Sequence, residues 1–184
     1  MSTPWKACSM PGIGETFARL KREGRPGLVT YVTAGDPDLA RSAEILKALD
    51  RARADLLEVG VPFSDPLADG PVIQRATERA LAAGGSLRAS LALVRSVRPA
   101  VSAPIVLFSY ANPLMRMGVD RFAREASSAG VQGVLALDLP IEEAEDFDRV
   151  LAAAGFDSIF LLSPTTTEER IRKAARLGRG FLYG

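Results

Sequence analysis

The sequence predicts an α/β protein built from repeated β/α units around a parallel sheet. Six short apolar or β-branched runs recur along the chain, and segments with apolar residues at every third or fourth position separate them. The short runs lack a clean alternation of polar and apolar residues, which is typical of strands buried on both faces. The intervening segments are long enough for the helical crossovers that parallel strands require.

The predicted elements follow one another in a regular order. Strands are expected at residues 28–33, 56–60, 104–109, 133–137, 158–162 and 180–183. Helices are expected between them at residues 39–49, 72–83, 87–97, 119–129 and 141–151. Residues 1–26 precede the first strand as an N-terminal extension with a short helix at 13–22. No linker divides the chain, so residues 1–184 are expected to form one domain, whose six strands make either an open sheet or six-eighths of a barrel.

Composition narrows the possible chemistry. Apolar residues make up 47% of the 184 residues and charged residues 24%, as in folded globular proteins. The net charge of 23 − 22 = +1 gives no reason to expect binding to nucleic acid or to an anionic membrane. Histidine is absent, which excludes histidine bases, histidine metal ligands and triads that contain histidine. Any chemistry must therefore use carboxylates, hydroxyls, lysine, arginine or backbone dipoles.

The chain shows no targeting pattern. Residues 1–10 lack the basic stretch and apolar core of a secretory signal, and no uncharged apolar run reaches 18 residues. The single cysteine, Cys8, cannot form an intrachain disulfide or a thiolate zinc site. We therefore expect a soluble protein of the cytoplasm.

Two acidic residues lie at or near the ends of the first two predicted strands, where parallel α/β folds bind their ligands. Asp36 follows the first strand, and a helix cap explains it better than a functional role does. Glu58 lies inside the otherwise apolar second strand. Burial there should raise its pKa into the range that suits a general acid or base, unless a salt bridge with lysine or arginine neutralises it. From spacing alone, both interpretations of Glu58 stay open.

The loop at 61–71 favours a functional interpretation of this region. It contains three prolines and two acids, and proline lowers the entropy that ordering a loop costs. Asp65 could be a plain turn residue, and Asp69 could cap the following helix. Alternatively, Glu58 and Asp69 could face each other across a ligand and divide acid and base work between them.

The other predicted strand ends combine apolar, aromatic and hydroxyl side chains. Such a mouth suits a flat apolar ligand with a few polar contacts, although core packing explains any single one of these residues better. The side chains concerned are Phe108, Tyr110, Leu135, Leu161 and Tyr183. Asp138 either caps the helix after Pro140 or orients a neighbouring group.

Several segments together resemble one known family, that of the tryptophan synthase alpha subunit. The most specific is EVGVPFSDPLADGP at 58–71, a long loop motif. It is accompanied by YVTAGDP at 31–37, SYANP at 109–113, DLPIEE at 138–143 and GRGFLY at 178–183. The resemblance covers residues 13–184 and leaves 1–12 unmatched.

The resemblance implies a (β/α)₈ TIM barrel and a lyase of tryptophan biosynthesis. The implied reaction is the retro-aldol cleavage of indole-3-glycerol phosphate to indole and glyceraldehyde 3-phosphate, without a metal or an organic cofactor on the alpha subunit. By this resemblance Glu58 is the acid–base residue, and Asp69 interacts with the indole N–H and stabilises the positive charge that develops there.

The resemblance also implies a ligand pocket and a partner. The residues that would line the indole pocket are Tyr31, Phe108, Tyr110, Leu135, Leu161 and Tyr183. The loop around Pro62 and Asp65 resembles the surface that meets the beta subunit, a PLP enzyme that joins alpha subunits in an α₂β₂ heterotetramer.

The chain departs from the family pattern at its C-terminal end. Residue 184 falls at the sixth strand, and the family binds the substrate phosphate through loops after strands six to eight. This departure predicts a fragment with little or no activity of its own. The alternative function is a non-catalytic module that docks on a beta subunit. A metal-dependent barrel epimerase is disfavoured because those enzymes use histidine ligands.

Overall fold

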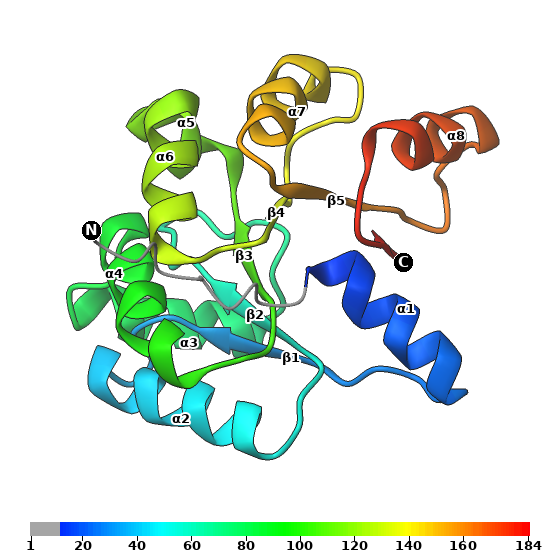
Figure 1. Cartoon of the computed structure of the whole chain (residues 1–184). Helices are drawn as coiled ribbons and strands as arrows, with labels where there is room; N and C mark the ends of the chain where they lie inside the picture. Colours follow the sequence, from blue (N-terminus) through cyan, green and yellow to red (C-terminus); the bar gives the residue numbers. More distant parts are fainter. Residues whose placement is uncertain (1–11) are drawn as a thin grey trace, which may run out of the picture.

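The computed structural model describes residues 12–184 and contains one sheet of six parallel strands, which confirms the predicted α/β class. The strands pair in the order in which they occur in the chain, β1 to β6 (Figure 1). Their bounds are β1 Val29–Thr33, β2 Leu56–Gly60, β3 Ile105–Ser109, β4 Gly133–Ala136, β5 Asp157–Leu161 and β6 Leu182–Tyr183. Consecutive parallel order is the arrangement of a β/α barrel, here an incomplete barrel of six strands.

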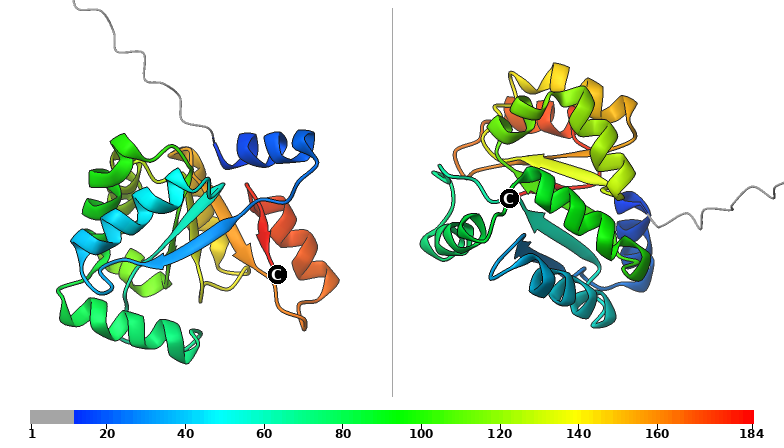
Figure 2. Two further views of the ribbon diagram at one scale, coloured as in Figure 1. Left: turned by 90° about the horizontal axis from the view of Figure 1, so that it is seen from below. Right: turned by 90° about the vertical axis from the view of Figure 1, so that its left-hand side faces the viewer.

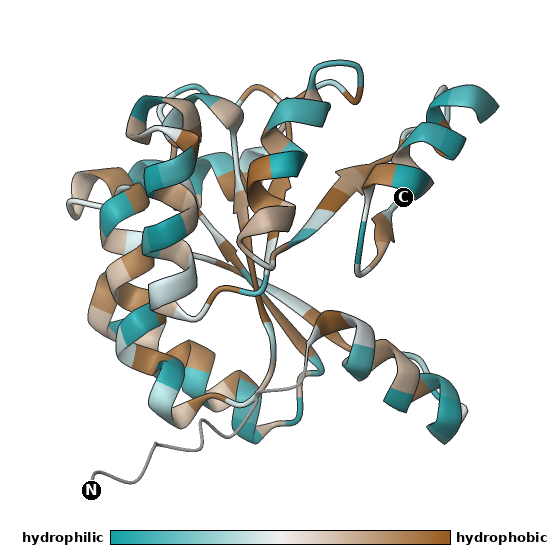
Figure 3. Ribbon diagram, turned by 45° about the horizontal axis from the view of Figure 1, so that its top comes forward, coloured by the Kyte–Doolittle hydropathy of each residue, from teal (hydrophilic) through white to brown (hydrophobic). Residues whose placement is uncertain are grey.

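Eight α-helices accompany this sheet in the described part of the chain. They are α1 Ile13–Glu23, α2 Leu39–Arg51, α3 Pro71–Ala82, α4 Leu87–Val97, α5 Ala111–Met117, α6 Val119–Ala129, α7 Ala144–Ala153 and α8 Glu168–Leu177, with a short 3₁₀ turn at Arg98–Ala100. α2, α4, α6 and α7 lie side by side as one layer. Figure 3 shows largely apolar strands at the centre and helices around them that carry both hydrophilic and hydrophobic residues. None of the described helices is long and apolar enough to cross a membrane.

Alternate residues of each strand point to opposite sides of the sheet and build two separate cores. The larger core fills the space between strands and outer helices and contains Leu57, Val59 and Leu107. The smaller core lies on the inward face. Its fully buried members come from α1 and from strands β2 to β5, and they are Ile13, Leu56, Val106, Leu135 and Ile159. The inward face is the one that carries Glu58.

α1 covers the amino-terminal ends of the strands. A capping box begins the helix, because Glu15 accepts a hydrogen bond from the Gly12 N–H at 3.1 Å. Ile13 reaches the first residue of β4, where Gly133 leaves room for it: a Cβ there would lie 2.6 Å from the Cδ1 of Ile13. α1 also lies beside the chain that leads into β6 (Figure 2), where the rings of Phe17 and Phe181 are 5.5 Å apart. The opposite end of the sheet, at the carboxyl ends, stays free of α1.

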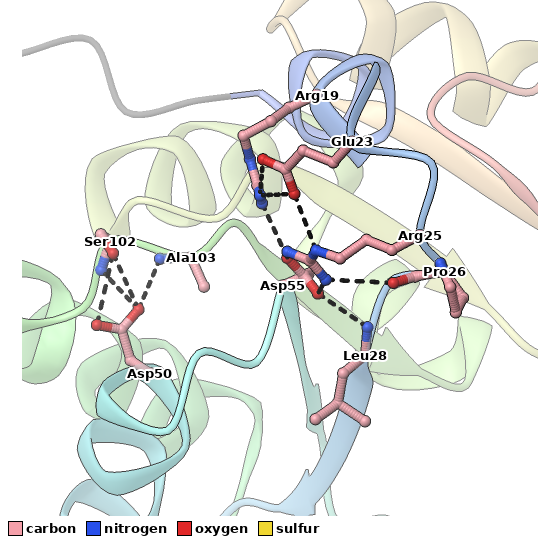
Figure 4. A network of polar contacts seen from close by, with 9 residues as sticks. All are labelled: Arg19, Glu23, Arg25, Pro26, Leu28, Asp50, Asp55, Ser102 and Ala103. Atoms are coloured by element: carbon pink, nitrogen blue, oxygen red, sulfur yellow. Dashed lines mark hydrogen bonds and ion pairs between the residues drawn. The ribbon is translucent and has the colours of Figure 1, made fainter. Parts of the chain in front are cut away.

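A buried carboxylate ties α1 to the sheet (Figure 4). The side chain of Asp55 is 4% exposed and accepts hydrogen bonds from Arg19 at 2.8 Å and from Arg25 at 2.9 Å. It also accepts the Leu28 N–H at 3.0 Å, just before β1. Arg25 and these other donors hold the pKa of Asp55 well below its usual range. The ion network therefore belongs to the scaffold, at the end of the sheet remote from Glu58.

Several predicted bounds were wrong. α5 and α8 were not predicted: α5 has only seven residues and includes Pro113, and α8 has few apolar residues, of which only Ala174 is buried. The helix predicted from residue 141 begins at Ala144, because residues 141–143 form a turn. The last strand is limited to Leu182–Tyr183 rather than 180–183. The helix of the N-terminal extension is present as α1, and residues 1–11 lie outside the described part of the chain.

Candidate functional site

The candidate site lies on the inward face near the carboxyl ends of the strands. Tyr31 on β1 is the register partner of Glu58 on β2, and Phe108 on β3 is the partner of Leu135 on β4. Leu161 and Tyr183 pair in the same way between β5 and β6. Parallel pairing in register therefore brings together side chains that are up to 152 positions apart in the sequence, since 183 − 31 = 152.

Glu58 is a buried carboxylate without a positive partner. Its residue exposure is 1%, and within residues 12–184 no lysine or arginine forms an ion pair with it. The Tyr183 hydroxyl donates to its Oε2 at 3.4 Å, whereas Oε1 is buried without a hydrogen-bond partner. Burial raises the pKa of Glu58 to about 7, and the hydrogen bond from Tyr183 opposes this rise only in part. The salt-bridge interpretation of Glu58 was wrong, and the expected rise of its pKa is confirmed.

Aromatic rings form a row on the inward face beside this carboxylate. The rings of Tyr31 and Phe108 meet edge to face at 5.5 Å, and those of Phe108 and Tyr183 meet at 6.3 Å. Phe181 continues the line toward α1, at 6.0 Å from Tyr183. Leu135 is fully buried in the same core, against which Phe108, Phe181 and Tyr183 pack. The inward face thus offers an apolar aromatic surface next to one carboxylate whose pKa is raised to about 7.

Asp69 lies on the loop that follows β2 and is half-buried. Burial raises its pKa above the ordinary range, and the nearby Tyr110 hydroxyl opposes the rise. Gly70, and not Asp69, occupies the capping position of α3, with Pro71 as the first helical residue. The capping interpretation of Asp69 was therefore wrong, and its carboxylate is left for another role.

Two side chains hold the Asp69 loop in place. The Tyr110 hydroxyl accepts the Ala68 N–H at 3.0 Å, and its ring packs on Phe63 at 5.2 Å. Gln74 on α3 donates to the Asp69 carbonyl oxygen at 2.9 Å. Tyr110 is thus turned to the loop rather than to the line of rings. Gln74 and Phe63 were missed by the sequence reasoning, because one glutamine in a helix and one loop aromatic carry no distinctive signal.

The outer part of the same loop is exposed. Asp65 is exposed and accepts a 2.6 Å hydrogen bond from Ser64, whereas Pro62 is buried and lines a hollow of about 520 Å³ between the loop, α3, α4 and α5. Leu67 is 92% exposed and Val72 is 70% exposed. The loop and the first turn of α3 thus present apolar side chains to solvent.

Two other acidic residues noted in the sequence, Asp36 and Asp138, have structural partners. Asp36 forms a bidentate ion pair with Arg79 on α3, with both contacts at 2.8 Å, and Asp38 rather than Asp36 caps α2. The capping prediction for Asp36 was therefore wrong. Asp138 accepts the Ala111 N–H at 2.6 Å and thereby caps α5, which lies after the neighbouring strand, and not the helix after Pro140.

Leu161 is the predicted site residue that stands apart from the others. It shares the inward face with Ile159 but is 48% exposed, and it contributes to a pocket of about 220 Å³ with Leu137 and Arg170. Within residues 12–184, no group of three or more acidic or cysteine side chains is placed to hold a metal ion.

Comparison with known proteins adds a family to this geometry. Residues 17–184 match the family described as "Tryptophan synthase alpha chain". A tryptophan synthase alpha chain of Geobacter sulfurreducens is 54% identical over 174 residues, which cover 95% of this chain and 66% of that relative. One of Burkholderia ambifaria is 53% identical over 175 residues, with 95% and 65% covered. The chain thus spans about two thirds of the length of the curated relatives that it matches.

Solved structures agree with the sequence match. The crystal structure of tryptophan synthase subunit alpha from Legionella pneumophila superimposes with a TM-score of 0.92 at 42% identity, covering 95% of this chain and 67% of that one. A structure of the tryptophan synthase α₂β₂ complex from Pyrococcus furiosus contains a chain with a TM-score of 0.82 at 42% identity, covering 85% of this chain and 67% of that one.

Proposed function

This chain belongs to the tryptophan synthase alpha chain family, and from that premise we propose that its site cleaves indole-3-glycerol phosphate into indole and glyceraldehyde 3-phosphate. The observation that carries the proposal is Glu58: a carboxyl group inside the barrel, without a cation, whose pKa lies at about 7. Such a group is present in both protonation states near neutral pH, which suits a residue that both gives and takes a proton.

The proposed reaction needs two proton transfers and one bond cleavage. The neutral Glu58 carboxyl group donates its proton to C3 of the indole ring, which leaves a positive charge shared with the ring nitrogen. The Glu58 carboxylate then takes the proton of the hydroxyl group on the adjacent side-chain carbon. As the C=O bond of the aldehyde forms, the carbon–carbon bond breaks, and its electron pair restores the aromatic ring.

Asp69 serves the ring nitrogen in this proposal. An anionic carboxylate that accepts the ring N–H hydrogen bond stabilises the cation formed by protonation at C3. The contacts of Tyr110 and Gln74 hold the loop that carries Asp69, and the charge of Asp69 acts on the phenol of Tyr31 on the inward face. Tyr31, Phe108 and Tyr183 would contact the ring, with Leu135 beneath it and Leu161 at the open side. The reaction runs on carboxyl groups alone, so we assign no cofactor to this chain.

We further propose a beta subunit of tryptophan synthase as the partner, in an α₂β₂ assembly in the cytoplasm, with PLP on the beta subunit. The loop after β2, from the buried Pro62 through the exposed Asp65 to the exposed Leu67, would contribute to the contact. Its support is the 92% exposure of Leu67, because a large apolar side chain in that position favours burial by another protein. We also propose that residues 1–184 form a single partial barrel domain.

Indole release tests the proposed activity. The assay uses the 184-residue chain and a fusion that adds the part of the Geobacter sulfurreducens relative that this chain does not cover. We expect measurable indole from the fusion and little from the chain alone. Glu58→Gln or Asp69→Asn in the fusion should lower turnover at least 100-fold, while Glu169→Gln, at an exposed position, should not. Near-parental turnover of either site variant would refute the mechanism.

The exposed apolar loop also supports the second candidate function, a non-catalytic module that docks on a beta subunit. In that case the 184-residue chain should bind a tryptophan synthase beta subunit and raise its turnover without releasing indole. Leu67→Ser should weaken this binding, whereas Ile171→Ser, on α8 and 38% exposed, should leave it unchanged. Absence of binding in a direct titration would exclude the docking function for this chain.

A further inference from the structure

The chain contains three tyrosines, and all three lie at the candidate site. Tyr183 donates to Oε2 of Glu58 at 3.4 Å, and Tyr110 accepts the Ala68 N–H at 3.0 Å. The hydroxyl of Tyr31 has no part in the proposed reaction, although its ring contacts Phe108. Besides being buried, the Tyr31 phenol lies close enough to Glu58 and Asp69 for the charges of both carboxyl groups to raise its pKa.

The backbone makes room for this hydroxyl at one particular place. A Cβ on Gly60 would lie 1.9 Å from the Tyr31 oxygen and 2.4 Å from Cζ, so the ring can occupy its position only because residue 60 is glycine. Gly60 follows Glu58 by two residues on the same face of β2, which places it about 7 Å further along the strand. Tyr31 and Glu58 are also register partners across β1 and β2. No hydrogen bond joins the Tyr31 hydroxyl to Glu58 in this structure, but the two side chains are near enough for the charge of Glu58, in addition to burial, to raise the pKa of the Tyr31 phenol.

Glu58 lacks hydrogen-bond donors when it is ionised. Its Oε1 is buried without a partner, and Oε2 has one long hydrogen bond. An ionised carboxylate has about four acceptor positions, and leaving one oxygen unsatisfied in a buried place is unfavourable. Tyr31 on the adjoining strand can supply the missing donor. Burial raises its own pKa to about 12, against a smaller effect of the Thr33 hydroxyl, so it keeps its proton throughout the range in which Glu58 ionises.

We propose that Tyr31 is a positioning residue whose hydroxyl donates to Oε1 of Glu58 when that carboxyl group ionises, so that Tyr31 and Tyr183 hold the carboxylate from both sides. The two hydrogen bonds would orient the carboxylate for the transfer that follows. The orientation of Glu58 for proton transfer rests on the proposed function, whereas the hydrogen bond between Tyr31 and Glu58 requires no substrate. The other groups that face Tyr31 are Thr33, Asp69 and Tyr110, and the rival acceptors among them are the Thr33 hydroxyl and the Asp69 carboxylate.

Labelling with [¹³Cζ]tyrosine tests the proposal directly in the 184-residue chain. The three resonances are assigned with single Tyr→Phe variants and followed from pH 5 to 9. The signals of Tyr31 and Tyr183 should share one inflection at the midpoint of Glu58, near pH 7. Glu58→Gln should abolish the inflection in both signals, whereas Asp69→Asn should preserve it. A Tyr31 signal that ignores Glu58, or that follows Asp69 instead, would overturn the proposal.

Two variants test the energetic effect of the hydroxyl. Tyr31→Phe should raise the midpoint reported by Tyr183 by about one pH unit, because one hydrogen bond to the charged form is lost. Gly60→Ala retains the phenol but displaces it, and should raise the midpoint in the same direction. Tyr110→Phe is the matched control and should leave the midpoint in place. An unchanged midpoint in Tyr31→Phe refutes the role of Tyr31, whether or not the protein cleaves indole-3-glycerol phosphate.

Discussion

Replacing Glu58 with glutamine is expected to stabilise the fold in neutral and alkaline solution. Burial raises the pKa of Glu58 from 4.5 to about 7, so the native state retains a proton that the unfolded state releases. Stability therefore falls as the pH rises from about 4.5, and the loss is complete above pH 7. The difference of about 2.5 in pKa corresponds to about 3 kcal/mol, at about 1.4 kcal/mol for each unit. Glutamine has nearly the same shape and never carries the charge.

Urea unfolding of the parent chain and of Glu58→Gln at pH 5 and at pH 8 measures this effect. The gain in the free energy of unfolding should be under about 1 kcal/mol at pH 5 and about 2–3 kcal/mol larger at pH 8. Any difference in packing between the two side chains is common to both conditions and drops out. Glu169→Gln, at an exposed position of α8, is the control and should show no such dependence on pH. An equal gain at both pH values would refute the burial of an uncompensated carboxylate.

Three further substitutions and one control test the scaffold by chemical unfolding. Asp55→Ala should lower the free energy of unfolding at pH 7 by about 2–3 kcal/mol, because removal of this buried carboxylate leaves Arg19 and Arg25 without their partner. This loss should shrink below pH 3.8, because the aspartate of the unfolded parent chain is then protonated. Asp138→Ala should cost about 1 kcal/mol and speed amide hydrogen exchange in α5, whose first N–H it caps. Gly133→Ala should lower the free energy of unfolding by about 1–3 kcal/mol, because the new Cβ would lie 2.6 Å from Ile13. The control is Gly14→Ala, a helical position with open space around it, which should be neutral or raise the stability by up to about 1 kcal/mol. A stable Gly133→Ala protein, or a loss in Asp55→Ala that persists unchanged in acid, would contradict these assignments.

The strands could be predicted from the sequence because burial on both faces leaves a continuous apolar run, as in β2 and β3. The helices with a wide apolar stripe, such as α4 and α6, could be predicted for a related reason. α8 could not, since the sequence EERIRKAARL buries only Ala174 and reads as a solvated segment. Local pattern therefore reveals an element in proportion to the apolar surface that the element buries.

The site could be predicted in part. The sequence indicated Glu58 as a candidate because it is an acid in an apolar strand. That it has no positively charged partner became apparent only from the structure, which places no arginine or lysine beside it. Asp36 and Asp138 show the limit of the method, because their partners, Arg79 and the start of α5, lie 43 and 27 residues away in the sequence. Spacing along one segment contains no information about such contacts. The role of Gly60 likewise depends on a ring from another strand.

The strictly consecutive order of the six strands has a consequence for how the protein is made. Each strand pairs with the one synthesised just before it, so a chain leaving the ribosome can extend the sheet one unit at a time. α1 is the exception, because its first residue, Ile13, packs against Gly133 and Gly180, which are synthesised far later. We therefore expect α1, although it is synthesised first, to become protected from hydrogen exchange last. Pulse-labelled hydrogen exchange on stalled nascent chains would show protection of β1 and β2 before that of α1.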